Sequence, residues 1–316
     1  MPDTPFSAAP DPAPSASQTG GPGLPERPDH WFTLADGRRL AYRVQGPVDA
    51  PPVFYFHGWP GSRLEPGFFD LSAVRLIALD RPGYGQSSPQ DARTLTDWAA
   101  DVGALADGLG LRRFGIVGMS GGGPYAAACA HALGARVITC VLISALGPPE
   151  APGMSSIRLS LLRALGKRPS TGTALFGMAR RVLQSPKNDR YVVRLRKVIP
   201  RGDRDLEALD PAFLSHLLNS WREGTRASVA GMASDARVYG TPWPFKLEDI
   251  SVPVRLWHGE ADRIVPSTIA EHAHARLGDS VLKLYPEEGH ISLIRIHLDT
   301  ILEDLRRCMA GGEVTL

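Results

Sequence analysis

The chain has 316 residues, 43% of them hydrophobic, and a formal net charge of +2. This length is enough for one sizeable domain with an insertion, and the apolar content is enough for a real core. Because the charge is nearly balanced, composition gives no electrostatic case for binding nucleic acid or an anionic membrane. The three cysteines are widely spaced and form no C-x-x-C pair, which favours buried, inert thiols and a reducing compartment.

Residues 1–28 are predicted to be a disordered tail, because prolines recur there among Ser, Ala and Gly. The segment lacks the basic start and the apolar run of a secretory signal. No stretch of the sequence approaches the ~18 apolar residues of a membrane span. We therefore expect a cytoplasmic protein that makes no membrane contact.

Strand-like segments recur along the rest of the chain. Residues 31–34 and 39–44 flank Asp36-Gly37, a hairpin signal that predicts an antiparallel edge. Further apolar runs predict strands at 53–56, 75–79, 114–117, 137–143, 254–257 and 281–285. Most are separated by helix-length segments, of which residues 96–109 are the clearest, ended by Gly110. This βαβ rhythm predicts a mostly parallel sheet with helices on both faces.

The rhythm breaks between residues 148 and 245, where no convincing strand is found and helices are predicted at 157–165, 174–183, 191–198 and 213–221. We expect a helical cap over residues 148–245 on a core made of 29–147 and 246–316. Apolar residues of this cap predict a hydrophobic substrate pocket: Leu161, Leu162, Leu165, Phe176, Met178, Leu217, Leu218, Trp221 and Met232. The alternative is that most of them only pack the cap onto itself.

A serine stands between a predicted strand and a predicted helix, in Gly118-Met119-Ser120-Gly121-Gly122. A G-x-S-x-G sequence at such a junction is typical of a nucleophile elbow, and the glycines are needed where strand and helix come too close for side chains. The alternative is a Gly-rich loop that only turns the chain or holds a phosphate.

An acid and a base follow downstream in the order that such an elbow requires. Asp262 comes after the strand at 254–257, and His290 lies in the loop expected after the strand at 281–285. Because the carboxyl ends of parallel strands lie on one edge of a sheet, Ser120, Asp262 and His290 can converge there. Glu260 is the local alternative to Asp262 as the acid.

The loop after the strand at 53–56 completes the predicted site. Gly58 has no side chain, so the backbone can come close to a bound oxyanion. The predicted donors are the backbone N–H groups of Trp59 and of Gly121, because Pro60 has no N–H. His57 and Gly58 are expected to support this loop.

Five motifs follow one another in a specific order. They are His57-Gly58-x-Pro60-Gly61, Asp80-Arg81-Pro82-Gly83-Tyr84-Gly85-x-Ser87, the Ser120 elbow, His258-Gly259-x-x-Asp262 and Gly289-His290. With them the sequence resembles the α/β-hydrolase superfamily over most of residues 31–310. The first motif is similar to that of prolyl aminopeptidases and epoxide hydrolases. Epoxide hydrolases, however, carry an aspartate where this chain has Ser120.

The resemblance implies an α/β-hydrolase fold: a mostly parallel sheet with an N-terminal antiparallel hairpin, helices on both faces and a helical lid insertion. It also implies a serine hydrolase that needs no metal and no organic cofactor. We expect cleavage of a carboxylic ester or lactone of a small, largely apolar substrate through an acyl-enzyme. An aminopeptidase or amidase, a C–C bond hydrolase, and a non-catalytic binding protein on the same fold stay open. The natural substrate and the oligomeric state stay open as well.

Overall fold

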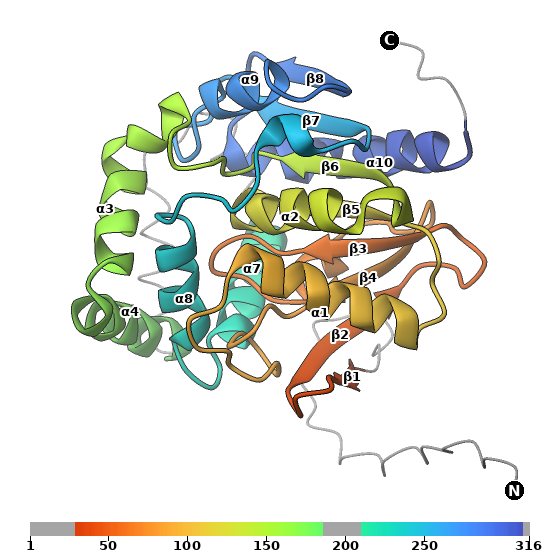
Figure 1. Ribbon diagram of the computed structural model, residues 1–316. Helices are drawn as coiled ribbons and strands as arrows, with labels where there is room; N and C mark the ends of the chain where they lie inside the picture. Colours follow the sequence, from red (N-terminus) through yellow and green to blue (C-terminus); the bar gives the residue numbers. More distant parts are fainter. Residues whose placement is uncertain (1–28, 186–209, 312–316) are drawn as a thin grey trace, which may run out of the picture.

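The computed structural model describes residues 29–185 and 210–311, and the predicted tail and the predicted helix at 191–198 lie outside them. A mixed sheet with the order β1-β2-β4-β3-β5-β6-β7-β8 runs through the molecule (Figure 1). The strands are β1 Asp29–Thr33, β2 Arg39–Gln45, β3 Pro52–Phe56, β4 Arg75–Leu79, β5 Phe114–Met119, β6 Val137–Ile143, β7 Val254–Gly259 and β8 Ser280–Tyr285. Each predicted strand is confirmed, with ends that move by at most two residues.

The hairpin of β1 and β2 forms the antiparallel edge. The pairs β1–β2 and β2–β4 are antiparallel, whereas β3 pairs with β4 and β5 in parallel. Gly37 in the hairpin turn has a φ of 85°, a conformation that favours glycine. The remaining pairs to β8 are parallel. All six residues of β5 are buried, as expected for a parallel strand covered on both faces.

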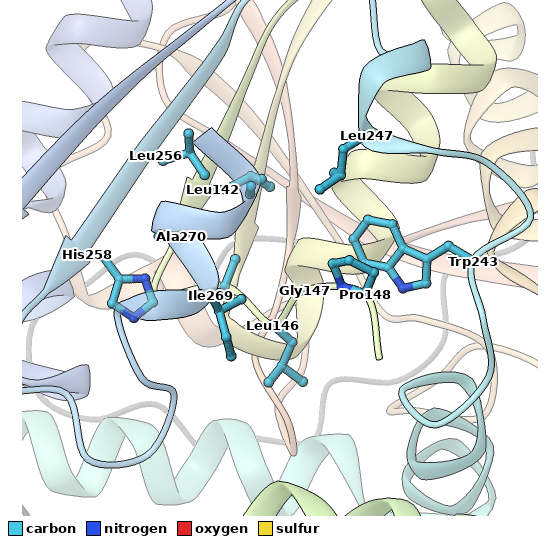
Figure 2. A pocket seen from close by; sticks show the side chains of 12 residues that line it. Leu142, Leu146, Gly147, Pro148, Trp243, Leu247, Leu256, His258, Ile269 and Ala270 are labelled. Atoms are coloured by element: carbon cyan, nitrogen blue, oxygen red, sulfur yellow. The ribbon is translucent and has the colours of Figure 1, made fainter. Parts of the chain in front are cut away.

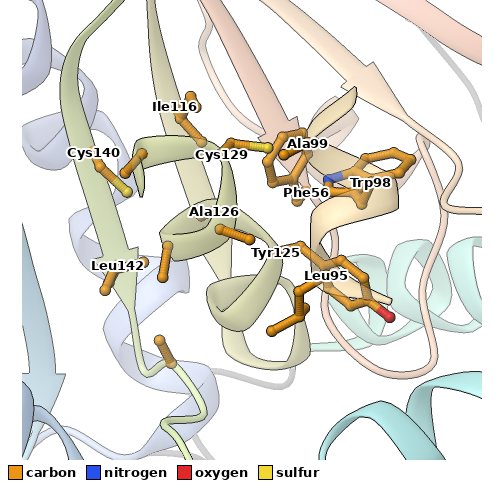
Figure 3. Packing of buried hydrophobic residues seen from close by; sticks show 14 of the residues in the cluster. Phe56, Leu95, Trp98, Ala99, Ile116, Tyr125, Ala126, Cys129, Cys140 and Leu142 are labelled. Atoms are coloured by element: carbon orange, nitrogen blue, oxygen red, sulfur yellow. The ribbon is translucent and has the colours of Figure 1, made fainter. Parts of the chain in front are cut away.

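Helices cover the two faces of the sheet. They are α1 Leu95–Gly108, α2 Gly123–Leu133, α9 Thr268–His274 and α10 His290–Met309. Phe54 and Phe56 of β3 share one apolar cluster with residues of α1, α2 and α9, while Val53 and Tyr55 share another with residues of α10. This alternation is the two-residue period of a strand. Figure 3 shows the first cluster, in which the rings of Phe56 and Trp98 meet edge to face with centroids 5.2 Å apart.

Two isoleucines of α10 allow a matched test of the second cluster. Ile301 is fully buried, whereas Ile296 is 49% exposed. We expect Ile301→Ala to lower the free energy of unfolding by about 2–5 kcal/mol, because it leaves a cavity under the sheet. The same change at Ile296 should cost about 0.5 kcal/mol or less. Urea unfolding of both variants measures the difference, and equal losses would contradict this assignment of the core.

Between β6 and β7, residues 144–185 and 210–253 contain the helices α3 Ile157–Gly166, α4 Pro169–Gln184, α7 Pro211–Gly224 and α8 Ala230–Val238. The described part of 148–245 contains helical segments and no strand. Helices α3, α4 and α8 stand together at one side of the sheet (Figure 1). The sequence pattern did not single out α8. The division into a core and a cap stays a prediction.

The apolar residues of this helical segment behave in two ways. Most of the predicted pocket residues pack into apolar clusters with their neighbours: Leu162, Leu165, Phe176 and Met232 in one, Leu217, Leu218 and Trp221 in another. Leu161 and Met178 are instead 61% and 55% exposed. Their exposure gives no support to a role in lining a pocket, because helical periodicity identifies an apolar face but not what covers it.

Within residues 29–185 and 210–311, no helix combines the length and the apolar character needed to cross a membrane.

Candidate active site

The Ser120 turn joins β5 to α2 through the short 3-10 segment Ser120–Gly122. Ser120 has a φ of 51°, which is strained for a residue with a side chain and is found at nucleophile elbows. A Cβ on Gly118 would lie 2.6 Å from the Cβ of Ala126, and one on Gly122 would lie 2.1 Å from the Phe56 carbonyl oxygen. Both positions therefore require glycine, as the sequence pattern indicated.

The structure brings the three predicted catalytic side chains together. His290 Nε2 lies 3.0 Å from Ser120 Oγ, and His290 Nδ1 lies 2.7 Å from Asp262 Oδ2. All three residues are buried. His290 is the first residue of α10 rather than part of a loop, so the predicted loop ends one residue earlier, at Gly289. The helix start places the imidazole at the carboxyl edge of the sheet.

Asp262 is held in one orientation by its own loop. Its Oδ1 accepts hydrogen bonds from the backbone N–H groups of Ile264 and Val265, both at 2.8 Å. Burial alone would raise the pKa of this carboxyl, but attraction to His290 and hydrogen bonds from His258 and His290 lower it well below its ordinary value. The side chain is therefore a carboxylate, which can only accept hydrogen bonds. It follows that His290 Nδ1 carries a proton and that Nε2 presents a lone pair to Ser120.

His258 lies beside Asp262 and contacts the same loop. Its Nε2 lies 2.8 Å from the Val265 carbonyl oxygen and 3.5 Å from Asp262 Oδ2. The ring also borders a small apolar cavity with Leu146 and Ile269 (Figure 2). Ser120 does not line this cavity, so we assign the cavity no part in holding a substrate.

The loop after β3 lies directly beside the elbow. A Cβ on Gly58 would be 3.6 Å from Ser120 Cβ, and one on Gly121 would be 2.9 Å from Trp59 Cβ. The structure thus places the two residues predicted to supply oxyanion donors next to each other and next to the serine.

His57 is a fixed part of this loop. It is fully buried, and burial together with the positive charge of Arg81 lowers its pKa well below the ordinary value. Its Nδ1 donates to the Gly58 carbonyl oxygen at 2.8 Å, so its Nε2 is left to accept from the Arg81 backbone N–H at 3.4 Å. The neutral ring therefore binds two backbone groups, in agreement with the expected supporting role.

Glu65 is a buried residue of the site that the sequence analysis missed. Its Oε1 accepts the Gly58 backbone N–H at 2.9 Å and the Tyr55 hydroxyl at 2.8 Å. Burial raises the pKa of this carboxyl, against the hydrogen bonds that lower it. No local pattern marks Glu65, because its partners Tyr55 and Gly58 lie ten and seven residues earlier in the chain.

A second missed group is Asp235 of α8, which is fully buried. Arg81 Nη2 donates to its Oδ2 at 2.7 Å, and Arg93 Nη2 donates to its Oδ1. The tyrosine hydroxyls that also donate to this carboxylate belong to Tyr84, Tyr125 and Tyr239. Burial alone would raise the pKa of Asp235, but the two arginines and the hydroxyl groups lower it well below the ordinary value. We call these six residues the Asp235 cluster.

The lowered pKa of Asp235 has a consequence for acid stability. The carboxyl binds a proton more readily in the unfolded chain, where its pKa is near 3.8, than in the folded one. Its contribution is therefore complete above that value and is lost as the pH falls through the folded pKa. We expect thermal unfolding temperatures of the wild type to fall steeply below about pH 4. Asp235→Asn should be less stable at neutral pH but should show a flatter acid limb.

Asp49→Asn, at an exposed position before β3, serves as the control for this pH series and should follow the wild type. An equally steep acid limb in Asp235→Asn would contradict the assignment.

The sheet order, with a serine at the strand-to-helix turn after β5, defines the class as the α/β-hydrolase fold. Residues 53–299 match the alpha/beta hydrolase family, and the chain belongs to this family.

Several proteins that are similar in sequence or structure to this chain are enzymes. The chain is 29% identical to a non-heme chloroperoxidase of Streptomyces lividans, over 86% of this chain and 96% of that protein. It is 30% identical to a bifunctional esterase/perhydrolase of Acinetobacter calcoaceticus, over 87% of this chain and 97% of that protein. Among solved structures, an esterase of Thermogutta terrifontis has a TM-score of 0.64 at 20% identity, covering 91% of this chain and 99% of that one. The chain is therefore an α/β-fold hydrolase.

Proposed function

We propose that this enzyme cleaves a carboxylic ester or lactone of a small, largely apolar substrate through an acyl-enzyme on Ser120. The observation that carries the proposal is the continuous hydrogen-bonded chain from Ser120 Oγ to His290 at 3.0 Å and from His290 to Asp262 at 2.7 Å. A serine activated in this way attacks carbonyl carbon. The esterase/perhydrolase relative supports an ester as the substrate class.

The chemistry follows from the protonation states. His290 Nε2 takes the proton of Ser120 as Oγ attacks the carbonyl, and Asp262 stabilises the imidazolium that forms. The N–H groups of Trp59 and Gly121 bind the oxygen that becomes negative, each contributing about 3–4 kcal/mol to the transition state. His290 then gives its proton to the leaving alcohol. Water activated by the same histidine releases the acid and restores the serine.

The test is covalent labelling with a fluorophosphonate, read by intact-protein mass, together with hydrolysis of p-nitrophenyl esters. We expect labelling of the wild type and none of Ser120→Ala, which also loses ester hydrolysis. An unlabelled wild type would favour a non-catalytic binding protein. Amino-acid anilides in the same panel separate an ester hydrolase from an aminopeptidase or amidase, and activity on anilides alone would overturn the choice of ester.

A second proposed activity is perhydrolysis, the formation of a peracid from an ester and hydrogen peroxide. It is favoured by the similarity to a chloroperoxidase and an esterase/perhydrolase. If hydrogen peroxide replaces water in the second half-reaction, its oxygen attacks the acyl carbon, the Ser120 ester bond breaks and the product is a peracid. The proton balance is unchanged, because His290 accepts a proton from the peroxide and returns it to Ser120. Bromide oxidation that requires ester, peroxide and Ser120 together would support this activity. Its absence at saturating ester would exclude it.

Three further proposals rest on the sequence alone. They are the location in the cytoplasm, the cap assigned to residues 148–245, and the absence of nucleic-acid and membrane partners.

A further inference from the structure

Helix α8 contains the buried carboxylate of Asp235, whose partners contact the backbone near Ser120. One carboxylate, that of Asp235, meets two guanidinium groups and three hydroxyl groups in the Asp235 cluster. Taking so many polar groups out of water is costly, and such a cluster is weak evidence for stability. Its contacts with the backbone of the catalytic loops suggest what it does.

The first contact runs through Arg81 to the loop after β3. The Asp235 carboxylate holds Arg81 Nη2 at 2.7 Å, and the same nitrogen donates to the Gly58 carbonyl oxygen at 3.3 Å. Nη1 of Arg81 donates to the His57 carbonyl oxygen. The Gly58 carbonyl and the Trp59 N–H belong to one planar peptide unit, so fixing the oxygen fixes the direction of the N–H. Donation to that oxygen also polarises the N–H.

The second contact runs through Tyr239 to the elbow. The Tyr239 hydroxyl lies 2.9 Å from the Gly121 carbonyl oxygen and 3.0 Å from Asp235 Oδ2, so its single proton is shared between two acceptors. A Cβ on Gly121 would lie only 2.4 Å from this hydroxyl. The Gly121 carbonyl shares its peptide plane with the N–H of Gly122, so Tyr239 does not fix the Gly121 N–H directly. It anchors the backbone of Gly121 on the carbonyl side, next to the N–H that is the other proposed donor.

A third contact joins α8 to the same loop. The indole Nε1 of Trp59 donates to the Met232 carbonyl oxygen at 3.3 Å. Helix α8 is thus connected to both residues of the proposed oxyanion hole, to Trp59 directly and through Arg81, and to Gly121 through Tyr239.

We propose that Asp235 is a positioning residue of the oxyanion hole: it holds Arg81, which orients the Gly58–Trp59 peptide unit, and Tyr239, which fixes the backbone of Gly121 at its carbonyl group. The inference rests on the proposed function, because it takes Trp59 and Gly121 as the donors. It adds a residue from the helical segment between β6 and β7 to the apparatus that stabilises the transition state. Asp235 itself touches no reacting atom.

Two tyrosines provide a matched test. The hydroxyls of Tyr84 and Tyr239 both donate to Asp235 Oδ2, at 2.7 and 3.0 Å, but only that of Tyr239 also reaches the elbow backbone. Tyr239→Phe and Tyr84→Phe each remove one hydroxyl from the cluster and keep the ring. Steady-state hydrolysis of p-nitrophenyl acetate by the full chain gives kcat and KM, and thermal unfolding gives the structural cost of each change.

We expect Tyr239→Phe to lower kcat by about 10-fold or more with KM within about 2-fold, less than the 10²–10³ that follows loss of a donor itself. Its rate of fluorophosphonate labelling should fall in parallel, because the phosphonyl oxygen occupies the same hole. Tyr84→Phe should change kcat by about 2-fold at most, at a similar cost in unfolding temperature. Equal losses of kcat in the two variants, or a change confined to KM, would overturn the proposal.

If the Asp235→Asn variant folds, its kcat should fall at least as far as that of Tyr239→Phe. If it does not fold, the comparison of the two tyrosine variants alone tests the proposed positioning role. Failure of the proposed function and failure of this inference give different results. A wild type without labelling or esterase activity removes the proposed function and this inference with it. An active wild type whose tyrosine variants behave alike removes the inference alone.

Discussion

Replacing His290 with alanine should lower kcat for a p-nitrophenyl ester by at least about 10⁴-fold, because no other described group is placed to take the proton of Ser120. His290 Nε2 is 3.0 Å from Ser120 Oγ. The neighbouring histidines His57 and His258 are committed to backbone carbonyl groups of their own loops. Activity measured under saturating ester should therefore approach that of Ser120→Ala.

The control for this variant is His131→Ala, at an exposed position at the end of α2. It removes the same side chain near the other end of the helix that begins at the elbow, and should keep wild-type kcat. Both variants should unfold cooperatively, so that loss of activity in His290→Ala is not loss of fold. A His290 variant that retains a tenth or more of the wild-type kcat would show that another base acts.

The site was predictable because its residues stand next to strand ends that local patterns reveal. Each strand has an apolar run long enough to be recognised, and Ser120, Asp262 and the first residues of the β3 loop follow those runs directly. Parallel pairing then brings the strand ends to one edge. This accounts for the convergence of Ser120, Asp262 and His290 across 170 residues of sequence separation.

Features that depend on contacts between distant elements were not predictable. Asp235 stands in a short helix with no signal of burial, and its partners lie 154 residues away at Arg81 and 110 residues away at Tyr125. Leu161 and Met178 looked like pocket residues because an apolar helix face does not reveal its partner. Their exposure became known only from the arrangement of α3 and α4.

Asp262→Asn is expected to lower kcat by about 10⁴-fold while the fold is kept. Oδ1 of Asp262 accepts two backbone N–H groups at 2.8 Å, from Ile264 and Val265. In the variant the side-chain oxygen must stay at that position, since an amide NH₂ there would face two donors. The NH₂ group then faces His290 Nδ1 and donates to it. His290 must carry its proton on Nε2, and it can no longer accept the proton of Ser120.

A misplaced imidazole proton predicts a result that mere loss of charge would not. In Asp262→Ala nothing imposes the unfavourable tautomer, so a fraction of His290 keeps Nε2 unprotonated. We therefore expect Asp262→Ala to retain activity equal to or above that of Asp262→Asn, although it deletes more of the side chain. Measuring kcat for both variants against one ester tests this order. An asparagine variant clearly more active than the alanine variant would mean that the charge of Asp262, and not the orientation of the imidazole proton, is its main contribution.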